Sequence, residues 1–231
     1  MAELTIKVPG GSFNAYLAVP RQLDAAPGVV VAQEIFGVNR VMRETCDWLA
    51  SQGFVAICPD LFWRIQPGID ITDKTKAEWD RAFELFNLFD VDKGIEDMKA
   101  ALAALRVHDA CTGKVGSVGY CLGGKIAFLM ATRSDTDASV GYYGVGLGDL
   151  LGEAGNISKP LMLHVAEKDQ FSSAEEIAKV TDTLASHANV TVNVYGGQDH
   201  AFARPGGEHY NQAAATLANG RTVAFFKEHL A

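Results

Sequence analysis

Cys121 lies in a run of residues that is suited to presenting a reactive thiol. The run Gly119-Tyr120-Cys121-Leu122-Gly123 has a glycine two positions before and two positions after the cysteine. A sharp turn between a strand and a helix needs small residues there, because a β-carbon would collide with the neighbouring backbone. Such a turn holds the thiol over the N-terminus of the next helix, where a thiolate is stabilised. We therefore predict a nucleophile at Cys121, although a buried cysteine in a glycine-rich turn gives the same pattern.

The same turn offers a backbone group that could serve the chemistry. The N–H of Leu122, at the start of the predicted helix, would be available to the negatively charged oxygen that forms when Cys121 attacks a carbonyl. Two other interpretations of this glycine-rich run, as a phosphate loop or as a dinucleotide-binding turn, are disfavoured. The run lacks the lysine of a phosphate loop, and it follows a central strand rather than the first strand that a dinucleotide-binding turn requires.

A nucleophile in such a turn belongs to a catalytic triad, in which an acid and then a histidine follow further along the chain. Asp169 follows the apolar run 161–165, and His200 follows the run 190–195, so both are expected at the carboxyl ends of strands. The other histidines are disfavoured because they precede the cysteine or fall in predicted elements: His108, His164, His187, His209 and His229. We predict that His200 is the base.

The choice of the acid is less restricted. Asp199 is adjacent to His200 and would have difficulty turning onto its ring, and Asp149 lies in a glycine-rich loop; Glu167 is the third alternative. We favour Asp169, which would hold the tautomer of the imidazole and stabilise the imidazolium.

The loop Gln33-Glu34-Ile35-Phe36-Gly37, after the apolar run 29–32, is the expected source of a second oxyanion donor. We predict that this donor is the N–H of Ile35. Glu34 would then be a carboxylate within the site that exchanges a proton with the thiol, the alternative being a surface glutamate.

The elements that position these residues follow from an alternation of short apolar runs with longer helical patterns. This alternation is typical of an α/β fold with a mostly parallel central sheet and helices on both faces. Strands are predicted at 29–32, 54–58, 115–118, 138–143, 161–165 and 190–195. Helices are predicted at 40–52, capped by Asn39 and Gly53, and at 74–89, 93–107, 125–133, 173–187 and 210–229. We expect a single domain over 1–231.

Charge and composition disfavour several classes of protein. The 28 acidic and 20 basic residues give a formal net charge of -8, which disfavours nucleic acids and anionic membranes as partners. We expect no secretory signal, and no segment reaches the roughly 20 apolar residues of a membrane span. The four cysteines form no C-x-x-C pair, which fits a reducing compartment. We expect a cytoplasmic monomer that acts on a small molecule.

Five blocks of sequence, taken together, resemble the dienelactone hydrolase family of α/β-hydrolases. They are Ala32-Gln33-Glu34-Ile35-Phe36-Gly37-Val38-Asn39, Cys58-Pro59-Asp60-Leu61, Val118-Gly119-Tyr120-Cys121-Leu122-Gly123-Gly124, Gly141-Tyr142-Tyr143-Gly144 and His200-Ala201-Phe202-Ala203-Arg204. The resemblance implies hydrolysis of carboxymethylenebutenolide to maleylacetate without a metal or cofactor. It also implies a triad of Cys121, Asp169 and His200, with Glu34 controlling thiolate formation and the backbone of Ile35 and Leu122 forming the oxyanion hole.

The resemblance also suggests how a substrate carboxylate is held. Arg204 matches a family arginine that grips this group, and a guanidinium forks naturally onto a carboxylate; a solvated loop arginine is the alternative. Two departures concern the substrate. Ala201 replaces a family serine, and Trp79 aligns with a second family arginine, while Arg81 would face elsewhere on the helix. Trp79, Phe83 and Phe86 share one face, which forms either an apolar wall of the site or an aromatic core stripe.

The sequence therefore predicts a hydrolase of small lactones or esters that works through a cysteinyl acyl-enzyme. One alternative is a related carboxylesterase or thioesterase with a different substrate. Another is a redox-sensing or binding module that uses Cys121 only as a reactive thiol.

Overall fold

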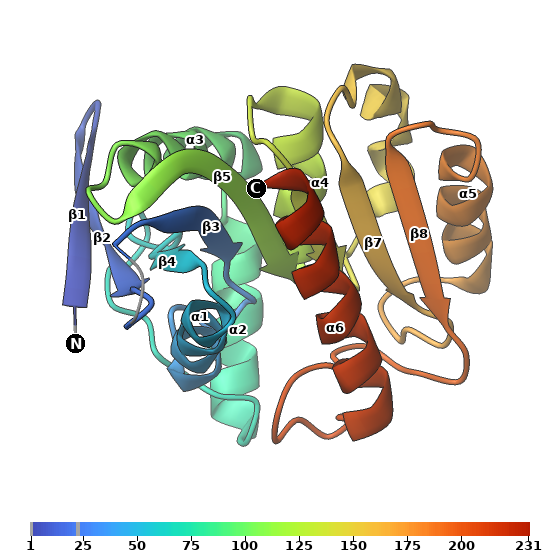
Figure 1. The fold of residues 1–231 in the computed structure, drawn as a ribbon. Helices are drawn as coiled ribbons and strands as arrows, with labels where there is room; N and C mark the ends of the chain where they lie inside the picture. Colours follow the sequence, from blue (N-terminus) through green and yellow to red (C-terminus); the bar gives the residue numbers. More distant parts are fainter. Residues whose placement is uncertain (1, 22–23) are drawn as a thin grey trace. The chain divides into compact units, whose positions relative to one another are not determined.

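The strand that precedes the candidate nucleophile, β5 (Cys111–Tyr120), contains the boundary between two units of the chain (Figure 1). In the computed structural model, which describes residues 2–21 and 24–231, the first unit ends at Ser117 and the second runs from Val118 to Ala231. The predicted single domain over 1–231 stays a prediction.

The first unit combines an antiparallel hairpin with parallel strands. In chain order its elements are β1 (Ala2–Val8), β2 (Gly11–Ala18), β3 (Ala26–Ala32), α1 (Arg40–Ser51), β4 (Val55–Pro59), α2 (Lys76–Leu88), α3 (Val91–Arg106) and the start of β5. The strands lie in the order β1-β2-β4-β3, with β5 next to β3. β3 pairs in parallel with β4, in the register Gly28 with Val55, whereas β2 pairs antiparallel with both β1 and β4. β3 carries the predicted apolar run into the interior, since Val29, Val30 and Val31 are fully buried.

Both predicted caps of α1 are confirmed. The Asn39 side chain accepts a hydrogen bond from the N–H of Met42 at 3.2 Å, which satisfies one of the donors at the helix start. Gly53 follows Gln52, the C-terminal capping residue of the helix.

 The φ of Gly53 is 95°, in the left-handed region, where a residue with a β-carbon would be strained. The core-facing stripe of the helix consists of Met42, Cys46 and Leu49.

The buried face of α2 differs from its aromatic stripe. Ala82 and Leu85 are the buried residues of this helix, whereas the Phe83 side chain is 42% exposed. The Trp79 ring stacks on Phe83 with centroids 5.5 Å apart and meets the edge of Phe36 at 5.1 Å. The interpretation of an aromatic core stripe is therefore wrong for Phe83, because the face of α2 that points into the core carries Ala82 and Leu85 instead.

The second unit consists of parallel strands and the helices that pack on them. In chain order its elements are the end of β5, α4 (Leu122–Arg133), β6 (Ser139–Tyr142), the 3₁₀ turns η1 (Leu147–Asp149) and η2 (Leu151–Asn156), β7 (Leu161–Ala166), α5 (Ala174–Leu184), β8 (Val190–Tyr195) and α6 (Gln212–His229). β6, β7 and β8 lie side by side in parallel, with Tyr142 opposite His164 and Ala166 opposite Tyr195. Their carboxyl ends therefore lie at one edge, where the loops of an open α/β sheet carry its sites.

Helices α5 and α6 lie on opposite faces of the sheet formed by β7 and β8, with α5 packed on β8 and α6 on β7 (Figure 1). Successive residues of a strand point to opposite faces, so β7 presents Leu163 on one face and His164 on the other. Leu163 lines a small cavity together with Val180 of α5, whereas His164 Nε2 lies 2.9 Å from the hydroxyl of Thr222 on α6.

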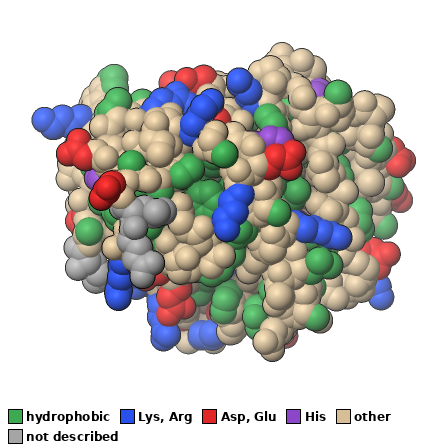
Figure 2. All heavy atoms as spheres, viewed as in Figure 1, with side chains coloured by type: hydrophobic (Ala, Val, Ile, Leu, Met, Phe, Trp, Pro, Cys, Tyr) green, Lys and Arg blue, Asp and Glu red, His purple; other side chains and the backbone are tan. Residues whose placement is uncertain are grey.

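The surface carries charges of both signs. Acidic and basic side chains are interspersed on the face drawn in Figure 2. Within residues 2–21 and 24–231, no helix combines the length and the apolar character that a membrane crossing requires.

Candidate active site

Cys121 occupies a strained turn between β5 and α4. Its φ is 58° and its ψ is -116°, and it is the residue that precedes the first turn of the helix. A β-carbon on Gly119 would collide with the carbonyl oxygen of Gly123, so the turn can close only with glycine at that position. The N–H of Cys121 donates to the carbonyl oxygen of Tyr142 at 3.1 Å, which ties the turn to β6. The predicted strand-turn-helix around Cys121 is confirmed as a backbone geometry.

His200 and Asp169 form a buried pair in the second unit. His200 Nδ1 lies 2.8 Å from one carboxylate oxygen of Asp169 and 3.0 Å from the other. The N–H of Phe171 donates to the same carboxylate at 2.9 Å and so fixes its orientation. Both side chains are about 5% exposed. With Nδ1 held by Asp169, the second ring nitrogen of His200 is left for the side-chain hydrogen bond with Cys121.

The environment of His200 favours its charged form. Burial disfavours an imidazolium, but the negative charge of Cys121 and the hydrogen bond to Asp169 outweigh this effect and raise the pKa of His200 to about 10.

Backbone strain is concentrated around these side chains. In the described part of the chain, the non-glycine residues with positive φ are Cys121, Tyr143 and Ala201, at 58°, 36° and 61°. The rings of Tyr143 and Phe171 both meet the His200 ring edge-on, with centroids 5.0 and 4.7 Å away. Such strain persists only where the surrounding structure enforces it, and it is common at functional sites. Sequence reasoning gave no role to Tyr143 or Phe171.

Arg204 lies in the same loop as His200 and is 8% exposed. The N–H of Arg204 donates to the carbonyl oxygen of Ala201 at 2.9 Å, which folds the loop back on itself after the histidine. The alternative of a solvated loop arginine is therefore wrong, because the side chain is buried. Whether it binds a substrate stays a prediction.

The remaining candidate histidines have other surroundings. His164 is fully buried, with Nδ1 2.8 Å from the Tyr195 hydroxyl, and burial lowers its pKa to about 3. His164 is therefore a neutral ring that forms hydrogen bonds in the interior of the unit, with Tyr195 and Thr222. His209 was expected in a helix, but α6 begins only at Gln212, so His209 lies in the preceding loop. Its Nε2 is 3.7 Å from a carboxylate oxygen of Asp199.

The alternative acids have surroundings other than the His200 ring. Asp199 accepts a hydrogen bond from the backbone N–H of His200 at 2.6 Å rather than from the ring. Glu167 accepts one from the N–H of Gly197 at 2.7 Å, and Asp149 lies in η1 on the surface. Asp169 is thus the acid whose carboxylate meets the imidazole.

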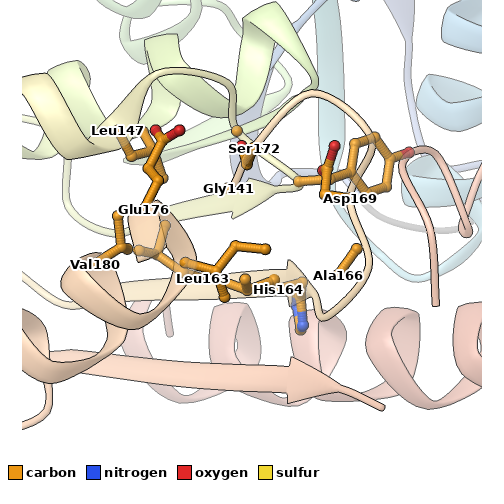
Figure 3. Close-up of a pocket in the computed structure, with 13 residues that line it drawn as sticks. Gly141, Leu147, Leu163, His164, Ala166, Asp169, Ser172, Glu176 and Val180 are labelled. Carbon is orange, nitrogen blue, oxygen red and sulfur yellow. The ribbon is translucent and has the colours of Figure 1, made fainter. Parts of the chain in front are cut away.

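A cavity of about 20 Å³ lies beside Asp169, on the side of β7 that α5 covers (Figure 3). Its lining includes Asp169, Ser172 and Glu176. This volume holds about one water molecule, so the cavity is too small to receive a substrate.

The first unit holds the other predicted site residues. Glu34 and Ile35 are 1% and 4% exposed, so Glu34 is not the surface glutamate of the alternative interpretation. Arg81 donates to Gln66 at 2.7 Å and to Glu84 at 2.5 Å, which engages its guanidinium within the unit. The roles of Glu34 and Ile35 stay predictions. Among residues 2–21 and 24–231, His, Cys, Asp and Glu side chains form no group of three or more that could hold a metal ion.

The chain is similar to known proteins in sequence and in fold. The model of the "Dienelactone hydrolase family" matches residues 13–230. A protein of Azospirillum brasilense named "Putative carboxymethylenebutenolidase" is 54% identical over 97% of this chain and 98% of its own length. "Carboxymethylenebutenolidase 1" of Cupriavidus pinatubonensis is 41% identical over 93% of this chain and 91% of its own. A crystal structure of a "Putative Dienelactone Hydrolase" from Klebsiella pneumoniae has a TM-score of 0.86 at 26% identity and covers 98% of both chains.

Proposed function

Because this chain belongs to the dienelactone hydrolase family and is an ester or lactone hydrolase with an α/β-hydrolase fold, we propose that it opens small, carboxylate-bearing lactones of the dienelactone type. Cys121 is the nucleophile, His200 the general acid and base, and Asp169 the group that orients His200. The observation that carries this proposal is the hydrogen-bonded series from Asp169 through His200 to Cys121, at a strained strand-to-helix turn.

Acylation begins with attack of the Cys121 thiolate on the lactone carbonyl. The new C–S bond places a negative charge on the carbonyl oxygen, and the N–H of Leu122 is available there because the first N–H groups of a helix have no acceptor within it. The ring C–O bond then breaks. The departing oxygen takes the proton of the His200 imidazolium, which leaves a thioester on Cys121 and a neutral His200.

Deacylation reverses the roles. Neutral His200 takes a proton from a water molecule, whose oxygen adds to the thioester carbonyl. The C–S bond breaks, the carboxylic acid product leaves, and the thiolate is again paired with imidazolium. Asp169 keeps Nδ1 protonated in both steps and stabilises the charge of the ring.

Arg204 supports a substrate that carries a carboxylate. Its position in the His200 loop and its burial favour a charge-assisted contact, which is stronger in a dry site than at a surface. Binding of the substrate carboxylate would then orient the lactone carbonyl toward Cys121.

A second candidate is a bulkier carboxylic ester. Arg81 is engaged by Gln66 and Glu84, and the half-buried Trp79 stacks on the exposed Phe83, which presents an apolar surface in the first unit. An aromatic ester would suit such a surface better than a small dicarboxylate.

The test compares dienelactone with aryl esters and thioesters of graded size by kcat/KM. We expect the lactone to be the best substrate, and Cys121→Ala to abolish its hydrolysis without changing the thermal unfolding temperature by more than a few degrees. Cys121→Ser should be weaker than the parent, because an alcohol needs a stronger base than a thiol. A preference for aryl esters would favour the second candidate, and full activity of Cys121→Ala would exclude Cys121 as the nucleophile. Alkylation of Cys121 without any turnover would favour the reactive-thiol alternative.

A further inference from the structure

The loops that carry Asp169 and His200 are joined by a series of hydrogen bonds. The N–H of Glu167 donates to the carbonyl oxygen of Tyr195 at 3.2 Å, and the N–H of Lys168 donates to that of Gln198 at 2.9 Å. These bonds continue the parallel pairing of β7 with β8 beyond the strand ends. The relative position of the two loops is therefore set by contacts directly behind the proposed catalytic groups.

Asp199 makes the contacts nearest to those groups. One of its carboxylate oxygens accepts from the N–H of Gln170 at 2.9 Å and from the N–H of His200 at 2.6 Å. Gln170 is the next residue after Asp169, and the following N–H, of Phe171, donates to Asp169 itself. A single oxygen thus holds the backbone of the base and the backbone beside the acid.

The other oxygen of Asp199 faces a third segment. It lies 3.7 Å from Nε2 of His209, in the loop before α6, and His209 Nε2 is also 3.2 Å from Nε2 of Gln170. The Asp199 and His209 side chains are 30% and 34% exposed, so water screens the contact between them. The two backbone bonds, rather than this ion pair, are the firm part of the arrangement.

We infer that Asp199 is a positioning residue of the proposed hydrolase, and this inference rests on the proposed function. By fixing the backbone of His200 against the backbone beside Asp169, Asp199 sets the distance between the imidazole and its carboxylate and the direction in which the ring meets Cys121. A misplacement of about 1 Å at a reacting group can lower a rate by about 100-fold. The contribution of Asp199 is expected in kcat, because it acts on the catalytic groups and does not touch the substrate.

Glu167 provides a matched control. Its carboxylate also joins the two loops, accepting from the N–H of Gly197 at 2.7 Å, but it contacts neither His200 nor Gln170. Glu167→Ala therefore removes a comparable bond between the same loops without releasing the backbone of the base. Asp199→Asn is the conservative variant, because its amide oxygen can accept from the same two N–H groups.

The experiment measures kcat and KM on the full chain for Asp199→Ala, Asp199→Asn and Glu167→Ala. Thermal unfolding is recorded for each variant to establish that it is folded at the assay temperature. We expect kcat to fall about tenfold or more in Asp199→Ala, with KM changed less than about twofold. Asp199→Asn should stay within about threefold of the parent and Glu167→Ala within about twofold. Equal rates for Asp199→Ala and Glu167→Ala, or an Asp199→Asn variant as slow as Asp199→Ala, would overturn the inference.

A second readout does not depend on hydrolysis. The rate at which iodoacetamide alkylates Cys121, followed by mass spectrometry of the Cys121 peptide, reports the thiolate as a function of pH. Displacement of His200 in Asp199→Ala should move the midpoint of this profile upward by about one pH unit, while Asp199→Asn and Glu167→Ala leave it in place. An unchanged midpoint in Asp199→Ala overturns the positioning role. Absence of hydrolysis by the parent together with a shifted midpoint would instead overturn the proposed function and leave the positioning role intact.

Discussion

Asp169 binds the imidazole of His200 through both of its carboxylate oxygens, which lie 2.8 and 3.0 Å from Nδ1. This contact takes up one ring nitrogen and leaves the other for Cys121. The consequence is a fixed tautomer: neutral His200 carries its proton on Nδ1, so Nε2 is the atom that exchanges protons with the thiol or with water.

Replacement of Asp169 by asparagine tests this relationship. The amide can donate to the ring and so favours the tautomer in which Nδ1 lacks its proton, which leaves the wrong nitrogen protonated toward Cys121. We expect kcat for lactone hydrolysis to fall by on the order of 10²–10⁴-fold. Asp149→Asn, the same change at the surface in η1, should retain the parent rate. An Asp169→Asn enzyme as fast as the parent would show that another group orients the base.

The raised pKa of His200 predicts how stability depends on pH. An unfolded histidine titrates near about 6.5, whereas folded His200 holds its proton to about 10. The contribution of His200 is therefore complete below about pH 6.5 and is lost as the pH rises toward 10, because the unfolded chain binds fewer protons in that interval. We expect the unfolding temperature to fall between pH 7 and pH 10.

The variant Cys121→Ala tests whether the thiol causes the fall of the unfolding temperature between pH 7 and pH 10. It removes the negative charge that most raises the pKa of His200, so the unfolding temperature should decline less steeply with pH than in the parent. Cys111→Ala, at a half-buried cysteine in the first unit, should follow the parent curve. Parallel curves for Cys121→Ala and the parent would mean that the thiol does not stabilise the imidazolium.

His164 predicts a dependence of the opposite sign at acid pH. Burial lowers the pKa of His164 to about 3, so the folded chain keeps it neutral while an unfolded chain binds a proton below about pH 6.5. Stability should therefore decrease as the pH falls from about 6.5 toward 3. His164→Gln removes this titration and should flatten the decrease, at the cost of lower stability at pH 7, since two buried hydroxyl contacts are disturbed. Urea unfolding of the parent, His164→Gln and His187→Gln between pH 4 and pH 7 measures the effect, and a His187→Gln curve as flat as that of His164→Gln would contradict it.

The strands around the candidate site follow from local patterns. Apolar runs bounded by turn residues predict β7 and β8 to within one residue, because buried parallel strands select such runs wherever they occur. The same reasoning misses β1 and β2. Of the seven residues of β1 only Ile6 is buried, so this hairpin shows little of the periodicity that would reveal it.

Contacts between loops are what the sequence does not predict. His209 lies outside α6 because Asn211 caps that helix, its side chain accepting from the N–H of Ala214 at 3.0 Å. The edge-on contact of Tyr143 with His200 depends on a positive φ of 36°, a conformation that a tyrosine adopts only when tertiary structure enforces it. Residue type alone also fails to distinguish Asp169 from Asp199. Both are aspartates in neighbouring loops, and their roles depend on which groups each carboxylate contacts.

Arg204 and Arg81 offer a matched test of how a substrate carboxylate is bound. Arg204→Met removes the buried guanidinium of the His200 loop, and we expect KM for a carboxylate-bearing lactone to rise about 10- to 100-fold, because a charge-assisted contact contributes about 1.5–3 kcal/mol. Arg81→Met should change KM less than about twofold, since Gln66 and Glu84 already engage that guanidinium. The rates of both variants with a neutral aryl ester serve as the control, because that substrate has no carboxylate to lose. If Arg204→Met impaired the neutral ester as much as the lactone, Arg204 would support the loop and not the substrate. If Arg81→Met alone raised KM for the lactone, the carboxylate would be bound by the helix α2 side chain instead.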